Sequence, residues 1–274
     1  MIAIIAGTGS LPVEACKALL QEGKKFFVIA LFPEDNGAML AAIIHGKASL
    51  IQQPFYKPGT IIDILKKHKT THVLMIGKVD KSNLLKKVKL DWYGIKLLAS
   101  LVTKSDSSIM EKIVSELEKE HMTVIKQDEV LKTLIVPPGI LTGTMTPELE
   151  KNIAFGIGMA QKLSEYDIGQ TVVVKDDMIL AVEAIEGTDN CIKRGIGLGK
   201  NNVIVCKAAR TNQNKKFDLP TLGPSSLQNI QKGEIAAIAW LWSHTLIAQQ
   251  DLFVKQAKDL GITLVSYEPS KIKI

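Results

Sequence analysis

The feature that most constrains the fold is an alternation of apolar runs and amphipathic segments that begins at the first residue. Residues 1–7 (MIAIIAG) form an unbroken apolar run, residues 8–23 contain a turn and an amphipathic segment, and residues 24–32 (KKFFVIALF) form a second run. Short apolar runs bounded by glycine are typical of strands buried on both faces. The pattern therefore predicts a βαβ unit.

The alternation continues along the first half of the chain. Residues 61–69 are helical in pattern and precede the apolar run 72–79 (HVLMIGKV), and residues 109–122 form a strongly amphipathic helix before a short strand at 123–127. Strands and helices in this order predict a mostly parallel sheet with helices on both faces.

The texture changes near residue 137. Residues 136–152 concentrate proline, glycine and threonine, so we expect an irregular stretch there, with a helix opening at Pro147. Beyond it, residues 170–184 predict a pair of strands. Since 274 residues exceed what one core usually organises, we expect two domains, 1–136 and 137–274. The fold class is α/β, with a parallel sheet in the first domain and a second α/β domain.

Composition excludes several classes of protein. Hydrophobic residues make up 46% and charged residues 23% of the chain, as in globular proteins. The longest apolar runs, such as residues 235–242, fall short of the ~18 residues that span a bilayer. The first residues lack the pattern of a signal peptide, and three cysteines without CxxC spacing suit a reducing compartment. We therefore expect a cytoplasmic protein.

The basic residues favour a solvated surface over a nucleic-acid partner. The formal net charge is +6, but the lysines are spread over the whole chain. Only Arg194 and Arg210 among the 34 basic residues are arginines. Arginine supplies a planar fork for phosphate or carboxylate, so these two positions are either binding sites or retained by chance.

Two glycine-containing turns follow predicted strands. Gly7, Thr8 and Gly9 with Ser10 precede the first helix, where backbone N–H groups could meet an anion. The alternative is a purely structural turn. Because Pro12 stands where the dinucleotide-binding pattern needs a small residue, a nicotinamide cofactor is the weakest interpretation.

The second turn, Gly77 with Lys78, ends the predicted strand at 72–79. Ligands of open α/β sheets bind at the carboxyl ends of strands, and Lys78 could meet a phosphate there. A solvated lysine is the alternative.

A denser group of charges lies in the second half. Glu183, Glu186 and Asp189 follow a predicted strand, and Arg194 comes one to two helical turns later. Carboxylates beside an arginine can hold a divalent cation and pair with a phosphate. Alternatively, Thr188 or Asp189 caps a helix and Glu186 is a surface charge.

Asp218 lies between two apolar residues and shortly before Pro220, which restricts the backbone around it. From the residues alone, a structural and a functional role are equally open. The five histidines show neither HxH nor HExxH spacing, and neither a G-x-S-x-G elbow nor a P-loop is present. Serine hydrolases and P-loop NTPases are therefore excluded.

At these residues the chain resembles the LpxI-type UDP-2,3-diacylglucosamine pyrophosphatases of lipid A biosynthesis. Five motifs spread over nearly the full length carry the resemblance: IAGTGSLP, IGKVDK, KSDSSIMEKIVSELEKEHMTVI, DIGQTVVVKDDMILAVEAIEGTD and FDLPTLGPSSL. The last two are the most specific.

The resemblance implies a two-domain cytoplasmic enzyme of Gram-negative bacteria with a Rossmann-like N-terminal domain. It also implies that the lipid-bearing substrate binds between the domains. The enzyme would use Mg²⁺ to hydrolyse UDP-2,3-diacylglucosamine to UMP and 2,3-diacylglucosamine 1-phosphate (lipid X).

By match to the family's motifs, Asp218 is the expected essential carboxylate, followed by Asp189 and Glu186, and Asp218 and Asp189 are the expected metal ligands. Arg194 and Lys207 are the expected phosphate partners. Further substrate contacts are implied for polar and glycine residues near the motifs: Gly7, Thr8, Gly9, Ser10, Gly77, Lys78, Thr188, Gln213, Thr221 and Gly223.

Two departures from the family pattern support a rival hypothesis. Asn214 stands where the family has an aspartate, and Leu241 where it has a glutamate, within a segment that also holds Trp240 and Trp242. The rival is a catalytically silent member that binds a lipid-linked sugar nucleotide. The tryptophans either pack in the core or meet acyl chains.

The acyl chains of such a substrate also predict a transient contact with the inner membrane surface through apolar side chains and lysines. A homodimer is expected only because symmetric dimers are the commonest oligomers.

Overall fold

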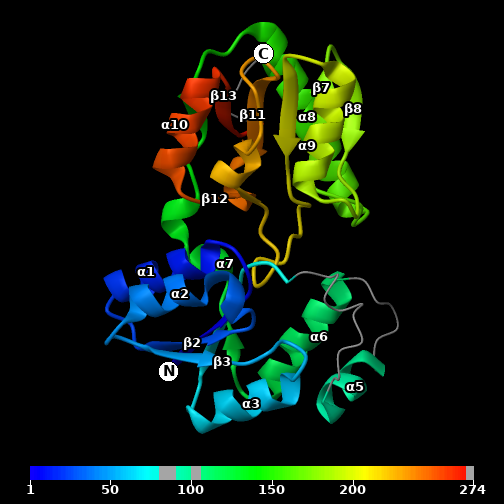
Figure 1. Ribbon diagram of the computed structural model, residues 1–274. Coiled ribbons are helices and arrows are strands. Elements are labelled where there is room, and N and C mark those ends of the chain that lie inside the picture. Colours follow the sequence, from blue (N-terminus) through cyan, green and yellow to red (C-terminus); the bar gives the residue numbers. More distant parts are fainter. Residues whose placement is uncertain (80–90, 100–105, 270–274) are drawn as a thin grey trace. The chain divides into compact units, whose positions relative to one another are not determined.

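The computed structural model describes residues 1–79, 91–99 and 106–269. The chain forms two units (Figure 1). The N-terminal unit consists of Met1–Leu131 together with Lys215–Phe217, and the C-terminal unit of Lys132–Asn214 together with Asp218–Ile274. The last two residues of the IGKVDK motif, at positions 80 and 81, lie outside the described residues.

The N-terminal unit is built on a five-stranded sheet in which every neighbouring pair is parallel. Its strands, in sheet order, are β3 (Ser49–Gln52), β2 (Phe26–Ala30), β1 (Ile2–Ala6), β4 (His72–Ile76) and β5 (Thr123–Val124). The helices are α1 (Leu11–Gln21), α2 (Pro33–Ile44), α3 (Pro58–Lys67), α5 (Trp92–Ala99), α6 (Asp106–Lys119) and α7 (Gln127–Val130).

Helices cover both faces of this sheet, with α1 and α2 on one side and α3 and α6 on the other (Figure 1). All five residues of β2 are buried, which explains its uninterrupted apolar sequence. The strand order reverses between β1 and β4, so the loops that follow these two strands lie at the switch point of the sheet. The predicted βαβ opening and parallel sheet are confirmed.

The C-terminal unit contains a six-stranded mixed sheet. Its strands, in sheet order, are β6 (Gly139–Thr142), β13 (Thr263–Tyr267), β11 (Ile235–Leu241), β9 (Val203–Lys207), β7 (Thr171–Lys175) and β8 (Met178–Val182). The strands β13, β11 and β9 are parallel, whereas β7 runs antiparallel to both β9 and β8. The predicted pair of strands at 170–184 is therefore a hairpin.

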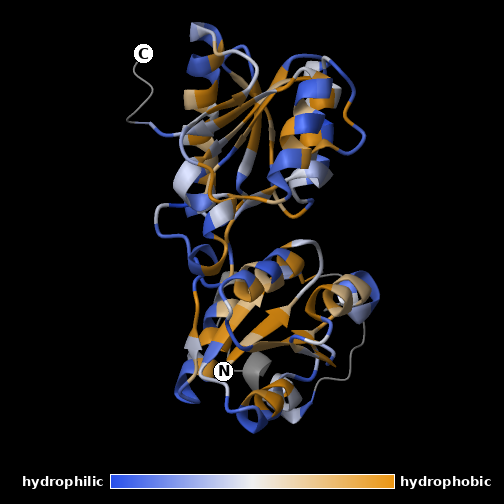
Figure 2. Cartoon of the chain, turned by 90° about the vertical axis from the view of Figure 1, so that its left-hand side faces the viewer, coloured by the Kyte–Doolittle hydropathy of each residue, from blue (hydrophilic) through white to orange (hydrophobic). Residues whose placement is uncertain are grey.

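Two apolar cores cover the two faces of this sheet. Helix α8 (Pro147–Glu165) packs its buried residues into one core, while α9 (Thr188–Gly199) and α10 (Gln250–Leu260) contribute to the other. The strands are accordingly hydrophobic and the outer helix surfaces hydrophilic (Figure 2). No helix in the described ranges is long and apolar enough to cross a membrane.

Short elements complete the C-terminal unit. The strands β10 (Thr221–Leu222) and β12 (Leu246–Ile247) pair in parallel. Three turns of 3-10 helix are also present: η1 (Lys132–Leu134), η2 (Pro224–Leu227) and η3 (Trp242–His244).

One expectation about local structure is wrong. Residues 136–152 were expected to be irregular before the helix, yet Gly139–Thr142 form β6, which pairs antiparallel with β13. Every non-proline residue of an edge strand can still pair with its single neighbour, and the register shift between Leu264 and Val265 absorbs the irregularity. The helix that opens at Pro147 is confirmed as α8.

Lys215–Phe217 belong to the N-terminal unit although they lie late in the chain. Lys215 forms an ion pair of 2.8 Å with Asp128, and its carbonyl accepts a hydrogen bond of 2.7 Å from the backbone N–H of Gln127. Phe217 packs against the apolar cluster of the parallel sheet. These three residues therefore complete the N-terminal unit.

Candidate active site

The candidate site of the C-terminal unit begins at the carboxyl end of β9. Lys207 is the last residue of this strand and lies opposite Thr171, the first residue of β7. The side chain of Lys207 is buried, with 4% of its surface exposed. A lysine at this depth needs a compensating charge and hydrogen-bond acceptors, because burial penalises an ammonium group.

Glu183 supplies that charge. Its Oε2 lies 3.6 Å from Lys207 Nζ, and its Oε1 accepts a hydrogen bond of 2.9 Å from the hydroxyl of Thr188. Lys207 Nζ in turn donates to the hydroxyls of Thr188 (2.9 Å) and Thr171 (3.0 Å). Four residues from β7, β9, the segment after β8 and the start of α9 therefore form one network.

The electrostatics of Glu183 agree with this arrangement. Burial alone would raise its pKa, but the positive charge of Lys207, the hydroxyls of Thr171 and Thr188, and the backbone N–H of Gln170 together hold the pKa below its ordinary value. Glu183 is therefore ionised at neutral pH and balances the ammonium of Lys207.

The other charges of the EGTD segment lie nearer to solvent. Arg194 forms a hydrogen-bonded ion pair of 2.5 Å with Glu186 and donates a second bond of 2.8 Å to the carbonyl of Val182. The bond from Arg194 lowers the pKa of Glu186. Asp189 lies exposed in the first turn of α9. The structure thus pairs Glu186 with Arg194, separately from the network around Lys207.

Asp218 lies in the loop before β10 and is mostly buried. Burial raises its pKa above the ordinary value, and the negative charge of Asp167 acts in the same direction. A hydrogen bond from Gln213 and the positive charges of Arg210 and Lys207 oppose the rise without cancelling it. A carboxyl group with a raised pKa is suited to accept a proton near neutral pH.

Arg210 lies close to this carboxyl group and to Asp167, from whose carboxylate its guanidinium is 4.0 Å away. Lys207 also lowers the pKa of Asp218, as the last and weakest of the influences on it. The candidate site therefore combines the Asp218 carboxyl group and Arg210 with the lysine network of the same unit.

The other residues that were expected to contact the substrate near Asp218 make contacts within the protein. Gln213 is buried and also donates to the backbone carbonyl of Asp218. The hydroxyl of Thr221 donates to the carbonyl of Leu219 (3.3 Å). A Cβ added to Gly223 would lie 2.9 Å from the carbonyl oxygen of Ala248, so this glycine permits a close backbone contact.

The glycine turns of the N-terminal unit lie at the switch point between β1 and β4. The backbone N–H and C=O groups of Thr8 and Lys78 bond to each other in an antiparallel bridge, with distances of 2.7 and 3.1 Å. A Cβ on Gly7 would meet the carbonyl of Lys78 at 2.4 Å, and Gly77 has a φ of +98°. The glycines therefore let the two turns pack together.

The backbone of Gly7 and Gly9 is also bonded to the start of α2. The N–H of Gly9 donates to the carboxylate of Asp35 (2.9 Å), and the amide of Asn36 donates to the carbonyls of Gly7 (2.8 Å) and Gly9 (3.1 Å). Ser10 occupies the N-cap position of α1 without a side-chain capping bond. The carboxylate of Asp35 occupies a donor that was expected to meet a substrate anion.

Sequence reasoning did not assign three residues of the site. Thr171 is hidden in an apolar run, Asp167 lies in a polar turn, and Glu183 was noted in the acidic group without a role of its own. The useful signal for Glu183 is its position directly after the strand β8, next to Lys207 at the end of another strand. The antiparallel pairing of β7 with both β8 and β9 brings these ends together.

Within the ranges that the structure describes, no three His, Cys, Asp or Glu side chains are grouped as a complete metal site. Mg²⁺ does not need such a group, because one or two carboxylates with water and substrate phosphates suffice. Asp218 and Asp189 are of the right chemical type, so the donor set is compatible with Mg²⁺ held partly by the substrate.

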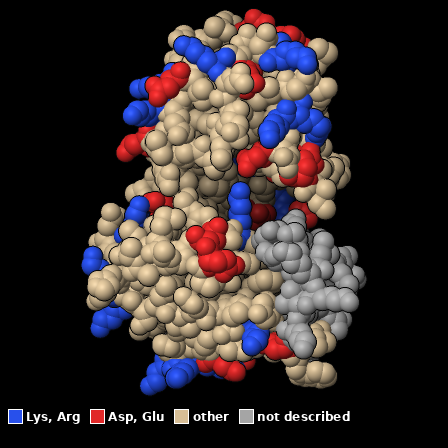
Figure 3. Space-filling view, viewed as in Figure 1, with Lys and Arg blue, Asp and Glu red and all other residues tan. Residues whose placement is uncertain are grey.

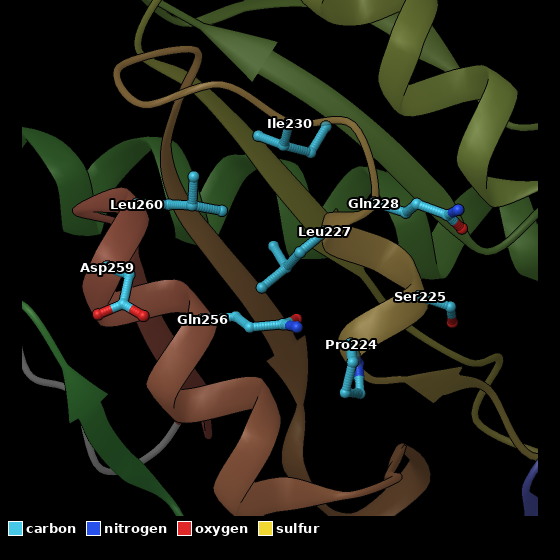
Figure 4. Close-up of a pocket in the computed structure, with 8 residues that line it drawn as sticks. All are labelled: Pro224, Ser225, Leu227, Gln228, Ile230, Gln256, Asp259 and Leu260. Atoms are coloured by element: carbon cyan, nitrogen blue, oxygen red, sulfur yellow. The ribbon is translucent and has the colours of Figure 1, made fainter.

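A surface hollow of about 500 Å³ lies elsewhere in the C-terminal unit, between η2 and α10 (Figure 4). Figure 4 shows Leu227 and Gln256 across from one another in it. Its lining contains none of the predicted site residues: it consists of Pro224, Ser225, Leu227, Gln228, Ile230, Gln256, Asp259 and Leu260. On the face shown in Figure 3, basic side chains are interspersed with acidic ones.

Comparison with known proteins assigns the chain to a family. The model of the LpxI N-terminal domain matches residues 1–134, and that of the LpxI C-terminal domain matches residues 137–265. The chain is also similar to the UDP-2,3-diacylglucosamine pyrophosphatase LpxI of Caulobacter vibrioides, with 26% identity over 285 residues that cover 98% of each chain. Two domain models that together span nearly the whole sequence settle the question: this protein belongs to the LpxI family.

Proposed function

We propose that this protein hydrolyses the pyrophosphate bond of UDP-2,3-diacylglucosamine to UMP and 2,3-diacylglucosamine 1-phosphate. Family membership and the name of the Caulobacter relative support this substrate. The single observation that carries the chemistry is Asp218, a mostly buried carboxyl group of raised pKa beside the charges of Arg210 and Lys207. Such a group can take a proton from water next to positive charges that attract a diphosphate.

In the proposed reaction, a water oxygen forms a bond to phosphorus while the bond from phosphorus to the bridging oxygen breaks. Asp218 accepts the proton of the attacking water, and the bridging oxygen leaves with one of the two phosphates. Arg210 and Lys207 stabilise the negative charge that develops on the phosphoryl oxygens. Arg194 and the first N–H groups of α9 are further candidates for phosphate contacts.

Mg²⁺ is part of the proposal. When bound, it would neutralise the charge of the diphosphate. Asp189 is the proposed carboxylate ligand, which leaves the carboxylate of Asp218 free to accept the proton of water. The other positions would be filled by substrate oxygens and water.

We also propose a cytoplasmic location with transient contact to the inner membrane, where an acylated substrate resides. Three apolar side chains support this: Tyr166, Ile168 and Ile185 are exposed by 79%, 47% and 95%. Gly169, which follows Ile168, lies against the backbone of Glu183, so the turn with Tyr166 and Ile168 adjoins the segment that carries Ile185. Ile185→Asp should reduce sedimentation with anionic lipid vesicles, and unchanged sedimentation contradicts the membrane contact.

The second candidate is a silent binding protein. Leu241, where the family has a glutamate, is buried in the apolar core beside α8. Trp240 is fully buried as well, in the core on the opposite face of the sheet. In this chain the side chain at position 241 is therefore part of the apolar core. Asn214 accepts a backbone bond of 3.2 Å from Asp218 through its carbonyl, which does not depend on its side chain.

Release of UMP from UDP-2,3-diacylglucosamine tests the two candidates. We expect release by the purified protein with Mg²⁺, loss of release in EDTA, and loss in Asp218→Asn. Substrate binding without release in the wild-type protein would favour the silent protein. UMP release that persists in EDTA would contradict the role of Mg²⁺ but not the hydrolysis itself.

A further inference from the structure

The ion pair of Lys207 and Glu183 differs from the other ion pairs in the described part of the chain. Its side chains are only 4% and 14% exposed, whereas every other pair has at least one side chain exposed by 29% or more. Surface ion pairs contribute little, but a buried pair costs desolvation energy that its geometry must repay. A pair this deep therefore needs a reason to be retained.

The geometry of the pair leaves the lysine incompletely bonded. Lys207 Nζ has three N–H groups, of which one goes to Thr171 and one to Thr188. The distance of 3.6 Å to Glu183 Oε2 is short enough for charge attraction but too long for a hydrogen bond. Glu183 thus neutralises the ammonium without taking its third N–H.

Glu183 also fixes the orientation of Thr188. The hydroxyl of Thr188 donates to Glu183 Oε1, so its lone pair is free to accept from Lys207. Thr188 is the first residue of α9. The carboxylate of Glu183 therefore holds the ammonium of Lys207 beside the N-terminus of α9, although the positive end of the helix repels the ammonium.

We propose that Glu183 is a positioning residue: it balances the charge of Lys207 and holds its ammonium at the start of α9, with one N–H left for a phosphate oxygen of the substrate. This role rests on the proposed function, since it assumes a phosphate-bearing substrate. Glu183 itself touches neither the phosphate nor the water. Its contribution to the transition state acts through Lys207 and Thr188.

Glu183→Gln tests this role because it keeps the shape of the side chain and removes its charge. With UDP-2,3-diacylglucosamine and Mg²⁺, we expect kcat to fall at least about tenfold, as for loss of one well-placed donor, while KM stays within about twofold. Glu183→Asp keeps the charge and should recover part of kcat. Should Glu183→Gln fail to fold, Glu183→Asp compared with wild type carries the same split between kcat and KM.

The matched control is Asp177→Asn, which removes the carboxylate of the exposed pair between Lys151 and Asp177 in the same unit. Asp177 has a φ of +58°, a conformation that asparagine also adopts, so the backbone should be unchanged. Kinetic constants equal to those of the wild type are expected for this control. Wild-type kcat and KM in Glu183→Gln would overturn the proposal.

Crystal structures of the wild type and Glu183→Gln provide a measurement that does not depend on activity. The proposal expects Lys207 Nζ to lose its hydrogen bond to Thr188 in the variant. If the wild type hydrolyses no substrate, the proposed function fails, and the structures alone decide the positioning role: an unmoved Lys207 overturns it, and a displaced one supports it.

Discussion

In each unit, candidate site residues lie at the carboxyl ends of parallel strands, but their hydrogen bonding differs. In the N-terminal unit, the turns after β1 and β4 are bonded to each other, and Asp35 and Asn36 bond to the backbone of Gly7 and Gly9. In the C-terminal unit, the end of β9 carries Lys207 with one N–H to spare. Carboxyl ends of parallel strands are where α/β proteins bind ligands, but position alone does not make a site. What distinguishes the end of β9 is that its lysine is buried, with a hydrogen-bonding capacity that Thr171 and Thr188 only partly use, whereas Lys78 at the N-terminal edge is exposed.

The largest expected effect concerns Asp218. Asp218→Asn should lower kcat for UMP release by about 10³-fold, because the proposed proton acceptor is lost. Its free energy of unfolding should not fall, since burial already disfavours the charged carboxylate. Steady-state kinetics and urea unfolding measure the two quantities. If Asp218→Asn retains UMP release, Asp218 is not the proton acceptor, and the C-terminal site loses the chemical role that sets it apart from the N-terminal turns.

Glu183→Gln should produce the largest loss of stability. Breaking a buried ion pair by removing one partner costs about 3 kcal/mol in the free energy of unfolding. Because the pKa of Glu183 is lowered in the folded state, its contribution is present above its unfolded pKa and is lost as the pH falls through the folded value.

The difference between wild type and Glu183→Gln, measured by urea unfolding from pH 7 downward, should therefore shrink only in acid. A difference that is independent of pH would show that packing, and not charge, accounts for the loss. Asp177→Asn is again the control and should leave the unfolding free energy unchanged within error.

Gly77→Ala tests the packing of the turns after β1 and β4 in the N-terminal unit. Its φ is +98°, and the added Cβ would lie 2.8 Å from the carbonyl of Thr8, so both the conformation and the contact are unfavourable. We expect a loss of about 2 kcal/mol in the free energy of unfolding. Gly158→Ala is the matched control, because its Cβ meets nothing within 4 Å in the helix α8. That variant should be at least as stable as the wild type, and equal stabilities of the two variants would deny the packing role of Gly77.

The smallest effect is expected for Asp35→Ala, which removes the acceptor of the Gly9 N–H. We expect a loss of about 1 kcal/mol in stability and a KM for UDP-2,3-diacylglucosamine within about twofold of wild type. A clearly lower KM would mean that Asp35 competes with a substrate anion for Gly9. The N-terminal edge would then be a second binding site, and the comparison would have to be redrawn.

Local patterns predicted most of the fold. Apolar runs marked β1, β2 and β4, because all the buried residues of these strands are apolar. The edge strand β6 escaped prediction because it is only four residues long, follows two prolines, and pairs with β13, more than a hundred residues later in the chain.

The site shows the same division. The motif around Asp218 and the clustered acids drew attention to the C-terminal unit, in which the structure forms the network around Lys207. The partnership of Glu183 with Lys207 and Thr171 depends on which strands lie side by side, and sequence spacing does not encode that order. The internal bonding of the Gly7 turn was equally hidden, since Asp35 belongs to the next helix.

Because Lys215–Phe217 belong to the N-terminal unit, this unit is not formed by one continuous segment of the chain. The N-terminal family model ends at residue 134, which suggests a place to cut the gene. A fragment ending there would leave Asp128 without Lys215 and uncover the apolar surface on which Phe217 packs. The N-terminal half is therefore not a transplantable module as its sequence stands. To be grafted or studied alone, it would have to carry this tripeptide with it, for example as a peptide supplied in trans.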